Sequence, residues 1–159
     1  MNERKMLERF SSPFIPNMIA AFQTRESLFL MMEYMPGGDL RFHINSCRTF
    51  SESTTSRFTL IVEFITACIM ESLEYLHRQS IVHRDVKPEN LVFDRLGYLR
   101  LTDFGIAKLK SSQKIEDTSG TPGYMAPEVM CKKNHSYEAD FFALGVIVYE
   151  CMIGRVFPP

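Results

Sequence analysis

Residues 83–90 read His-Arg-Asp-Val-Lys-Pro-Glu-Asn, and this stretch is the most informative one in the chain. Two triplets follow it in order, Asp-Phe-Gly at 103–105 and Ala-Pro-Glu at 126–128. The first two stretches supply a carboxylate, a lysine, an amide and a second carboxylate, groups that can hold a hydroxyl nucleophile and metal ions around a phosphate. One tripeptide alone would be weak evidence, but the three together in this order are a specific signal.

The composition is that of an ordinary globular domain, with 159 residues, 45% of them hydrophobic and 23% charged. The formal net charge is -1 and the basic residues form no run, so we expect neither a nucleic-acid partner nor a membrane partner. The longest apolar stretches, 60–70 and 141–153, are too short to span a bilayer, and each contains a glutamate. Both are therefore predicted to be core helices.

Four cysteines stand at positions 47, 68, 131 and 151, and no two of them have the spacing of a metal site. Residues 1–10 are charged and contain no apolar signal segment. We therefore expect reduced thiols in an intracellular, cytoplasmic protein. The oligomeric state is left open by the sequence.

Turn residues and apolar periodicity divide the chain into short elements. Pro36-Gly37-Gly38 interrupts it and is interpreted as a hinge between a strand-rich part and a helical part. The fold class is therefore α+β. The predicted elements are helices at 2–10, 40–47, from N-caps at 51–54 to about 79, and 137–153; strands at 18–23 and 28–34; a hairpin at 91–93 and 98–102; and a polar loop at 108–121.

The three motifs resemble the catalytic loop, the metal-binding triplet and the end of the activation segment of eukaryotic protein kinases. Residues 33–40, 50–52, 75–77 and 120–122 most resemble the serine/threonine branch that includes the cyclic-nucleotide-dependent kinases. The resemblance covers nearly the whole chain. It implies a single incomplete kinase domain, with an N-lobe remnant at 1–35 (the end of a helix and two or three strands) and a mainly helical C-lobe remnant at 36–159. The implied activity is ATP-dependent phosphorylation of Ser or Thr in proteins.

The resemblance assigns roles around the transferred phosphate. Asp85 would accept or orient the proton of the attacking hydroxyl, and Lys87, with Thr121 in reach, would neutralise charge on the phosphate. Asn90 and Asp103 would hold Mg²⁺ through hard oxygen ligands. The residues implied around ATP are Glu3, Met32, Glu33, Met35, Asp39, Val92 and Asp103.

Glu3 has two interpretations. By resemblance it pairs with a nucleotide-binding lysine, and by composition alone it is a solvated glutamate favoured by the helix dipole. By resemblance too, Asp140 would hydrogen-bond the backbone of loop 83–90 and hold it rigid, because a buried aspartate needs such partners.

Arg84 is implied to bind an anion on the activation segment, which in this family is a phosphothreonine. The corresponding position here is Asp117, and Thr118 is next to it. Either Asp117 is a fixed substitute for phosphate, or Thr118 is phosphorylated with an offset of one residue, or the loop is simply solvated.

Three acidic residues match an acidic patch around the peptide groove of relatives that prefer basic substrates. They are Asp39, Glu89 and Glu150. The resemblance therefore implies protein substrates with basic residues near the Ser or Thr.

The chain departs from the family pattern in three places. It opens inside the helix of Glu3, without a glycine-rich loop or its lysine, and it ends at Pro159 before the later helices. It is also about seven residues longer near 56–62, nearly two helical turns, which is either a genuine lengthening of the helix or an error of the gene model. The rival functions are a catalytically impaired fragment that binds or regulates, and a small-molecule phosphotransferase.

Overall fold

The computed structural model describes residues 3–46, 55–110, 115 and 117–153, and for 55–58 it describes the backbone alone. The predicted N-caps at 51–54, the stretch 50–52 and Cys47 lie outside these residues. The elements in chain order are α1 (Glu3–Leu7), β1 (Met18–Gln23), β2 (Leu28–Met32), α2 (Leu40–Ser46), α3 (Thr55–Arg78), β3 (Ile81–Val82), the 3₁₀ helix η2 (Pro88–Asn90), β4 (Leu91–Phe93), β5 (Leu99–Leu101), β6 (Lys108–Leu109), α4 (Pro127–Met130) and α5 (Tyr137–Ile153).

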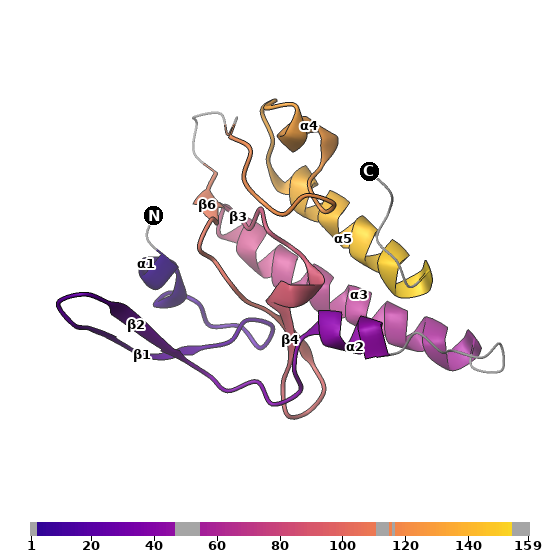
Figure 1. The fold of residues 1–159 in the computed structure, drawn as a ribbon, viewed down its shortest axis with the longest axis horizontal. Coiled ribbons are helices and arrows are strands. Elements are labelled where there is room, and N and C mark those ends of the chain that lie inside the picture. Colours follow the sequence, from indigo (N-terminus) through magenta and orange to yellow (C-terminus); the bar gives the residue numbers. More distant parts are fainter. Residues whose placement is uncertain (1–2, 47–54, 111–114, 116, 154–159) are drawn as a thin grey trace.

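The strands form antiparallel pairs. β1 pairs with β2, with Gln23 opposite Leu28, and β4 pairs with β5, with Phe93 opposite Leu99. In Figure 1 the β1–β2 hairpin and α1 lie on one side of α3, whereas α4 and α5 lie on the other. This mixture of small sheets and helices confirms the predicted α+β, kinase-like fold class.

The core lies between α3, α5 and the β4–β5 hairpin. α3 buries residues at a spacing of three or four on its inner face, including Ile65, Ile69, Leu73 and Leu76. Ile147 of α5 belongs to the same apolar cluster. A spacing of three or four residues places apolar side chains on one helical face, which is why both apolar stretches form helices against this core.

The part of α3 that contains the predicted extra residues is helical. α3 continues unbroken from Thr55 to Arg78, and Val62 is buried on the face that also buries Ile65. Leu60 and Ile61 are exposed. Whether the additional residues are a genuine lengthening stays a prediction.

Four short elements were not predicted, namely β3, η2, β6 and α4. β3 pairs with β6 through Ile81 opposite Leu109, so the predicted loop at 108–121 begins with a strand. Ile115 forms an isolated bridge with His135 further along. Strands of two residues are too short to show alternation in the sequence. Within the described ranges, none of the helices combines the length and apolar character needed to cross a membrane.

Candidate active site

A buried carboxylate in the first turn of α5 fixes the loop 83–90. The Asp140 side chain accepts the backbone N–H of His83 at 2.9 Å and that of Arg84 at 2.8 Å. His77, at the end of α3, lies 2.8 Å from the same carboxylate. Arg84 has a φ of 71°, a left-handed conformation that is uncommon outside glycine and is here held by the bond to Asp140. The loop therefore leaves β3 in a defined direction.

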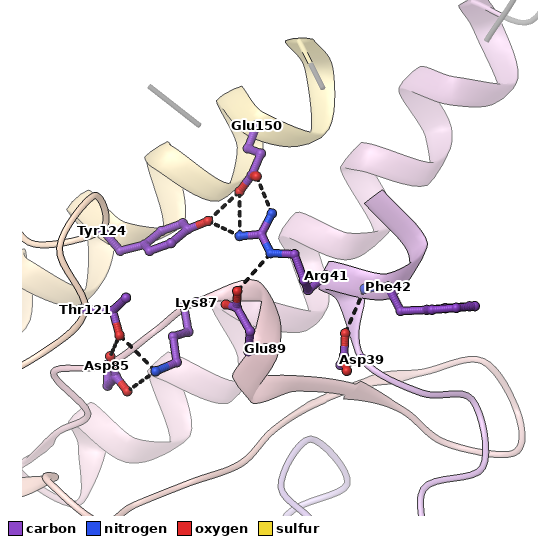
Figure 2. Close-up of polar contacts among 9 residues, drawn as sticks. All are labelled: Asp39, Arg41, Phe42, Asp85, Lys87, Glu89, Thr121, Tyr124 and Glu150. Carbon is purple, nitrogen blue, oxygen red and sulfur yellow. Dashed lines mark hydrogen bonds and ion pairs between the residues drawn. The ribbon is translucent and has the colours of Figure 1, made fainter. Parts of the chain in front are cut away.

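The carboxylate of Asp85 is held by three side-chain donors, of which Figure 2 shows Lys87 and Thr121. Thr121 donates its hydroxyl to Oδ1 at 2.6 Å, and Lys87 Nζ lies 2.7 Å from Oδ2. Asn90 Nδ2 contacts Oδ2 at 3.2 Å and the Asp85 carbonyl at 2.9 Å. Burial alone would raise the pKa of Asp85, but the hydrogen bonds from Lys87 and Thr121 outweigh it and hold the pKa below its ordinary value. Asp85 is therefore ionised near neutral pH.

A glycine brings Thr121 to this carboxylate. Gly120 has a φ of 130°, and a Cβ at that position would lie 2.6 Å from the carbonyl oxygen of Arg84. A side chain there would push the segment away from the loop. Lys87 Nζ also lies 2.8 Å from Thr121 Oγ1, so Asp85, Lys87 and Thr121 form one closed hydrogen-bonded group.

Asn90 and Asp103 lie on neighbouring backbone segments. The N–H of Thr102 donates to the Asn90 carbonyl at 2.9 Å, which places Asp103 one residue beyond this contact. Asp103 is exposed, has a φ of 65°, and accepts the Gly105 N–H at Oδ1.

These donors fit the ligand preference of Mg²⁺. The amide nitrogen of Asn90 is used by Asp85, which leaves its amide oxygen as the ligand atom. One amide oxygen and one exposed carboxylate suit an ion that keeps several waters and phosphate oxygens in its shell. In the part of the chain that the structure describes, no three His, Cys, Asp or Glu side chains gather into a complete metal cage.

Arg84 joins the loop 83–90 to the segment that contains Asp117. Its Nη1 lies 2.5 Å from Asp117 Oδ1, its Nε donates to the Ile106 carbonyl at 2.7 Å, and Lys108 contacts the other Asp117 oxygen. Burial alone would raise the pKa of Asp117, but the hydrogen bonds from Lys108 and Arg84 lower it to about 2. Thr118 is exposed.

Three of the residues expected around ATP, Glu33, Asp39 and Val92, form backbone hydrogen bonds or a β-bridge with other segments. Asp39 and Val92 form an isolated β-bridge, and Met32 and Met35 are partly buried. Glu33 donates its N–H to the Asn17 carbonyl at 2.9 Å. No ion pair joins Glu3 to another residue of the described ranges.

Sequence reasoning missed two arginines. Arg100 lies 2.8 Å from Glu33 and 2.8 Å from Asp94. Arg41 of α2 contacts Glu89, Glu150 and Tyr124, which are 48, 109 and 83 residues away (Figure 2). Partners this distant leave no local spacing signal. Of the three expected patch carboxylates, the remaining one, Asp39, accepts the Phe42 N–H at 2.7 Å and so caps α2.

Comparison with known proteins settles the family. The model of the protein kinase domain matches residues 1–159. The chain belongs to the protein kinase family. This kinase chain is 40% identical over 159 residues to human cGMP-dependent protein kinase 2, a match that covers 99% of the chain and 20% of that protein. It is also 40% identical to the cAMP-dependent protein kinase catalytic subunit of Dictyostelium discoideum, covering 23% of it, and 38% identical to ribosomal protein S6 kinase beta of Caenorhabditis elegans, covering 27%.

The kinase chain thus spans about a fifth to a quarter of the length of these relatives. The resemblance to the branch with cyclic-nucleotide-dependent kinases is confirmed by these matches. Protein kinases as a family use ATP and Mg²⁺ and act on protein substrates.

Proposed function

We propose that this protein transfers the terminal phosphoryl group of ATP to Ser or Thr hydroxyls of protein substrates. The observation that carries the proposal is the Asp85 carboxylate, held at once by Lys87, Thr121 and Asn90. Phosphoryl transfer has a loose transition state, so catalysis depends on positioning more than on basicity. A carboxylate fixed by three side chains meets that requirement.

The chain's own groups have separate tasks in this reaction. The substrate oxygen forms a bond to the terminal phosphorus while the bond from that phosphorus to its bridging oxygen breaks, and the bridging oxygen leaves with the electron pair. Asp85 orients the substrate hydroxyl and takes its proton. Lys87 stabilises the negative charge of the transferred group, and Thr121 hydrogen-bonds both Lys87 and Asp85 and so helps to position them.

Asn90 and Asp103 are the proposed ligands of Mg²⁺. The proposed nucleotide site is bordered by Met32, Glu33, Met35, Asp39 and Val92. Glu3 is the proposed partner of a nucleotide-binding lysine. When bound, ATP supplies the phosphoryl group and Mg²⁺ neutralises phosphate charge. The division into an N-lobe at 1–35 and a C-lobe at 36–159 stays a prediction.

We assign the activation-segment anion to Asp117. Its carboxylate contacts Arg84 and Lys108, whereas the neighbouring Thr118 is exposed. A fixed carboxylate carries less charge than a phosphate but needs no upstream enzyme to install it. The active arrangement of this segment is therefore proposed to be independent of phosphorylation.

Two finer expectations from the sequence bear on this proposal. A cytoplasmic location is supported by the free thiols of Cys68, Cys131 and Cys151, which suit a reducing compartment. The expected preference for basic residues near the Ser or Thr would depend on the negative charge of Glu89 and Glu150, but Arg41 already pairs with both of them, so this preference is not part of the proposal. A substrate's basic side chain would have to displace that arginine.

The test is transfer of radiolabelled phosphate from ATP to a mixed protein substrate by the protein at its full natural length, with Asp85→Asn as the matched variant. We expect labelled phosphoserine and phosphothreonine with the natural sequence and a loss of about 10²-fold or more in D85N. A nucleotide-dependent thermal shift without transfer would favour a binding module. Labelling of small alcohols or aminoglycosides but not of proteins would favour a small-molecule phosphotransferase.

A further inference from the structure

Arg41 lies at the junction of α2, η2 and α5. Its Nε donates to Glu89 Oε1 at 2.8 Å, and its two terminal nitrogens contact the two oxygens of Glu150, one of them at 3.3 Å. One terminal nitrogen also contacts the Tyr124 hydroxyl, which itself donates to Glu150 Oε2 at 2.5 Å. Figure 2 shows the guanidinium between these three side chains. A single cation thus engages two carboxylates.

Because Glu150 is buried, it needs a charged partner. The side chain of Glu150 is 3% exposed and that of Arg41 is 21% exposed, whereas that of Glu89 is 45% exposed. A buried carboxylate without a partner is strongly unfavourable, and a fork of donors is the geometry that satisfies it. Burial alone would lower the pKa of Arg41, but its hydrogen bonds to Glu150 and Glu89 hold the pKa above the ordinary value. Arg41 is therefore a permanent counter-charge.

The cluster borders the proposed site of transfer. Glu89 directly precedes Asn90 in η2, and Tyr124 lies three residues after Thr121 in the segment that contacts Asp85. A polypeptide that presents a hydroxyl to Asp85 would therefore approach the segments that carry Glu89 and Tyr124. An arginine of that polypeptide would find both carboxylates bonded to Arg41 and would be repelled by its charge.

We propose that Arg41 is a specificity-determining residue. Its guanidinium pairs with Glu89 and Glu150, the two carboxylates that would otherwise bind an arginine of the substrate. The substrates are therefore Ser/Thr segments that need no basic residue opposite these carboxylates. This inference rests on the protein kinase activity proposed above.

The experiment compares paired peptides that differ only in having arginine or norleucine at single positions before the target serine. For the natural sequence, we expect the ratio of kcat/KM values within each pair to stay below about threefold. In Arg41→Gln the ratio should rise by about tenfold at the position facing Glu89 and Glu150, through KM rather than kcat. Arg41→Lys, which keeps the charge, should keep the natural ratio.

Arg78→Gln is the matched control, because Arg78 is a surface arginine of α3 whose side chain is 77% exposed. It removes the same charge and should leave the ratio unchanged. Equal ratios in R41Q and R78Q would overturn the proposal. If R41Q does not fold, the natural sequence alone decides, since an arginine preference above about tenfold there would mean that the carboxylates are available.

Binding separates this inference from the proposed activity. Fluorescence anisotropy with peptides whose target serine is replaced by alanine measures the arginine dependence of Kd without any turnover. Absence of phosphate transfer with an arginine-dependent Kd that appears only in R41Q would contradict the proposed function but support the role of Arg41. Phosphate transfer to proteins, with the same arginine dependence of Kd in the natural sequence and in R41Q, would support the proposed function and contradict the role of Arg41.

Discussion

The backbone N–H of Arg84 donates to Oδ1 of the buried Asp140 at 2.8 Å. This bond ties the loop that carries Asp85 to the first turn of α5, far along the chain. Because Asp140 is 1% exposed, water cannot replace it as the acceptor. The direction of the loop, and with it the position of Asp85, depends on one carboxylate.

Asp140→Asn should therefore lower both stability and activity. The amide replaces one acceptor oxygen with an NH₂ group that faces donors, which should lower the free energy of unfolding by about 2 kcal/mol. Urea denaturation followed by circular dichroism measures this change. Glu138→Gln is the control, because Glu138 is exposed in the same turn of α5 and should change stability by less than about 0.5 kcal/mol. Equal effects of the two variants would contradict the role given to Asp140.

Thr121 offers a second test through a matched pair of substitutions. Thr121→Ser keeps the hydroxyl that contacts Asp85 and Lys87, whereas Thr121→Val keeps the shape and removes the hydroxyl. We expect T121S to retain activity within about threefold and T121V to lose about 10-fold or more in kcat, because Asp85 and Lys87 each lose one of the hydrogen bonds that position them. Steady-state phosphate transfer to one peptide measures both. A valine variant as active as the serine variant would exclude this positioning role.

If Asp117 supplies the anion for Arg84, the activity of the protein should not depend on an activating kinase. Asp117→Asn should lower kcat/KM by about 10-fold, because Arg84 and Lys108 lose their anionic partner. Thr118→Ala should leave kcat/KM unchanged, and so should treatment of the natural protein with a phosphatase. Activity assays with mass spectrometry of the segment check these outcomes. Loss of activity in T118A together with a phosphate found on Thr118 would favour that residue instead.

The same carboxylate should make stability depend on acid. The folded-state pKa of Asp117 is about 2, below the ordinary value of 3.8. The contribution of Asp117 to stability is therefore complete above the ordinary value and is lost as the pH falls through the folded-state value. The difference in free energy of unfolding between the natural sequence and D117N should be constant near neutral pH and shrink below about pH 5. A difference that grows on acidification would have the wrong sign.

Local patterns predicted most of the fold. α5 has the predicted bounds, and β1 does as well, because each has apolar residues in a clear arrangement between turn residues. β2 ends at Met32 rather than at the predicted residue 34, where the chain leaves the hairpin. The two-residue pairing of β3 with β6 depends on tertiary contact and had no local signal.

The site residues that are close in sequence could be predicted, and those that depend on distant contacts could not. Asp85, Lys87 and Asn90 are close in sequence, and the structure brings them together with Thr121 through Gly120. Arg41 could not be found from the sequence, because an arginine does not reveal which distant carboxylate it will reach. From the sequence alone, the carboxylates of Glu89 and Glu150 would be expected to be available to a basic substrate.

Arg100 fastens the segment after β2 to the β4–β5 hairpin. Its guanidinium holds Glu33 and Asp94 together, while Gly37 and Gly38 bond to the backbone of Phe93. The linker after β2 is thus fastened at both ends to the β4–β5 hairpin and travels with it. Any displacement of the β4–β5 hairpin would therefore carry this linker with it, because contacts on both sides of Pro36 join the two.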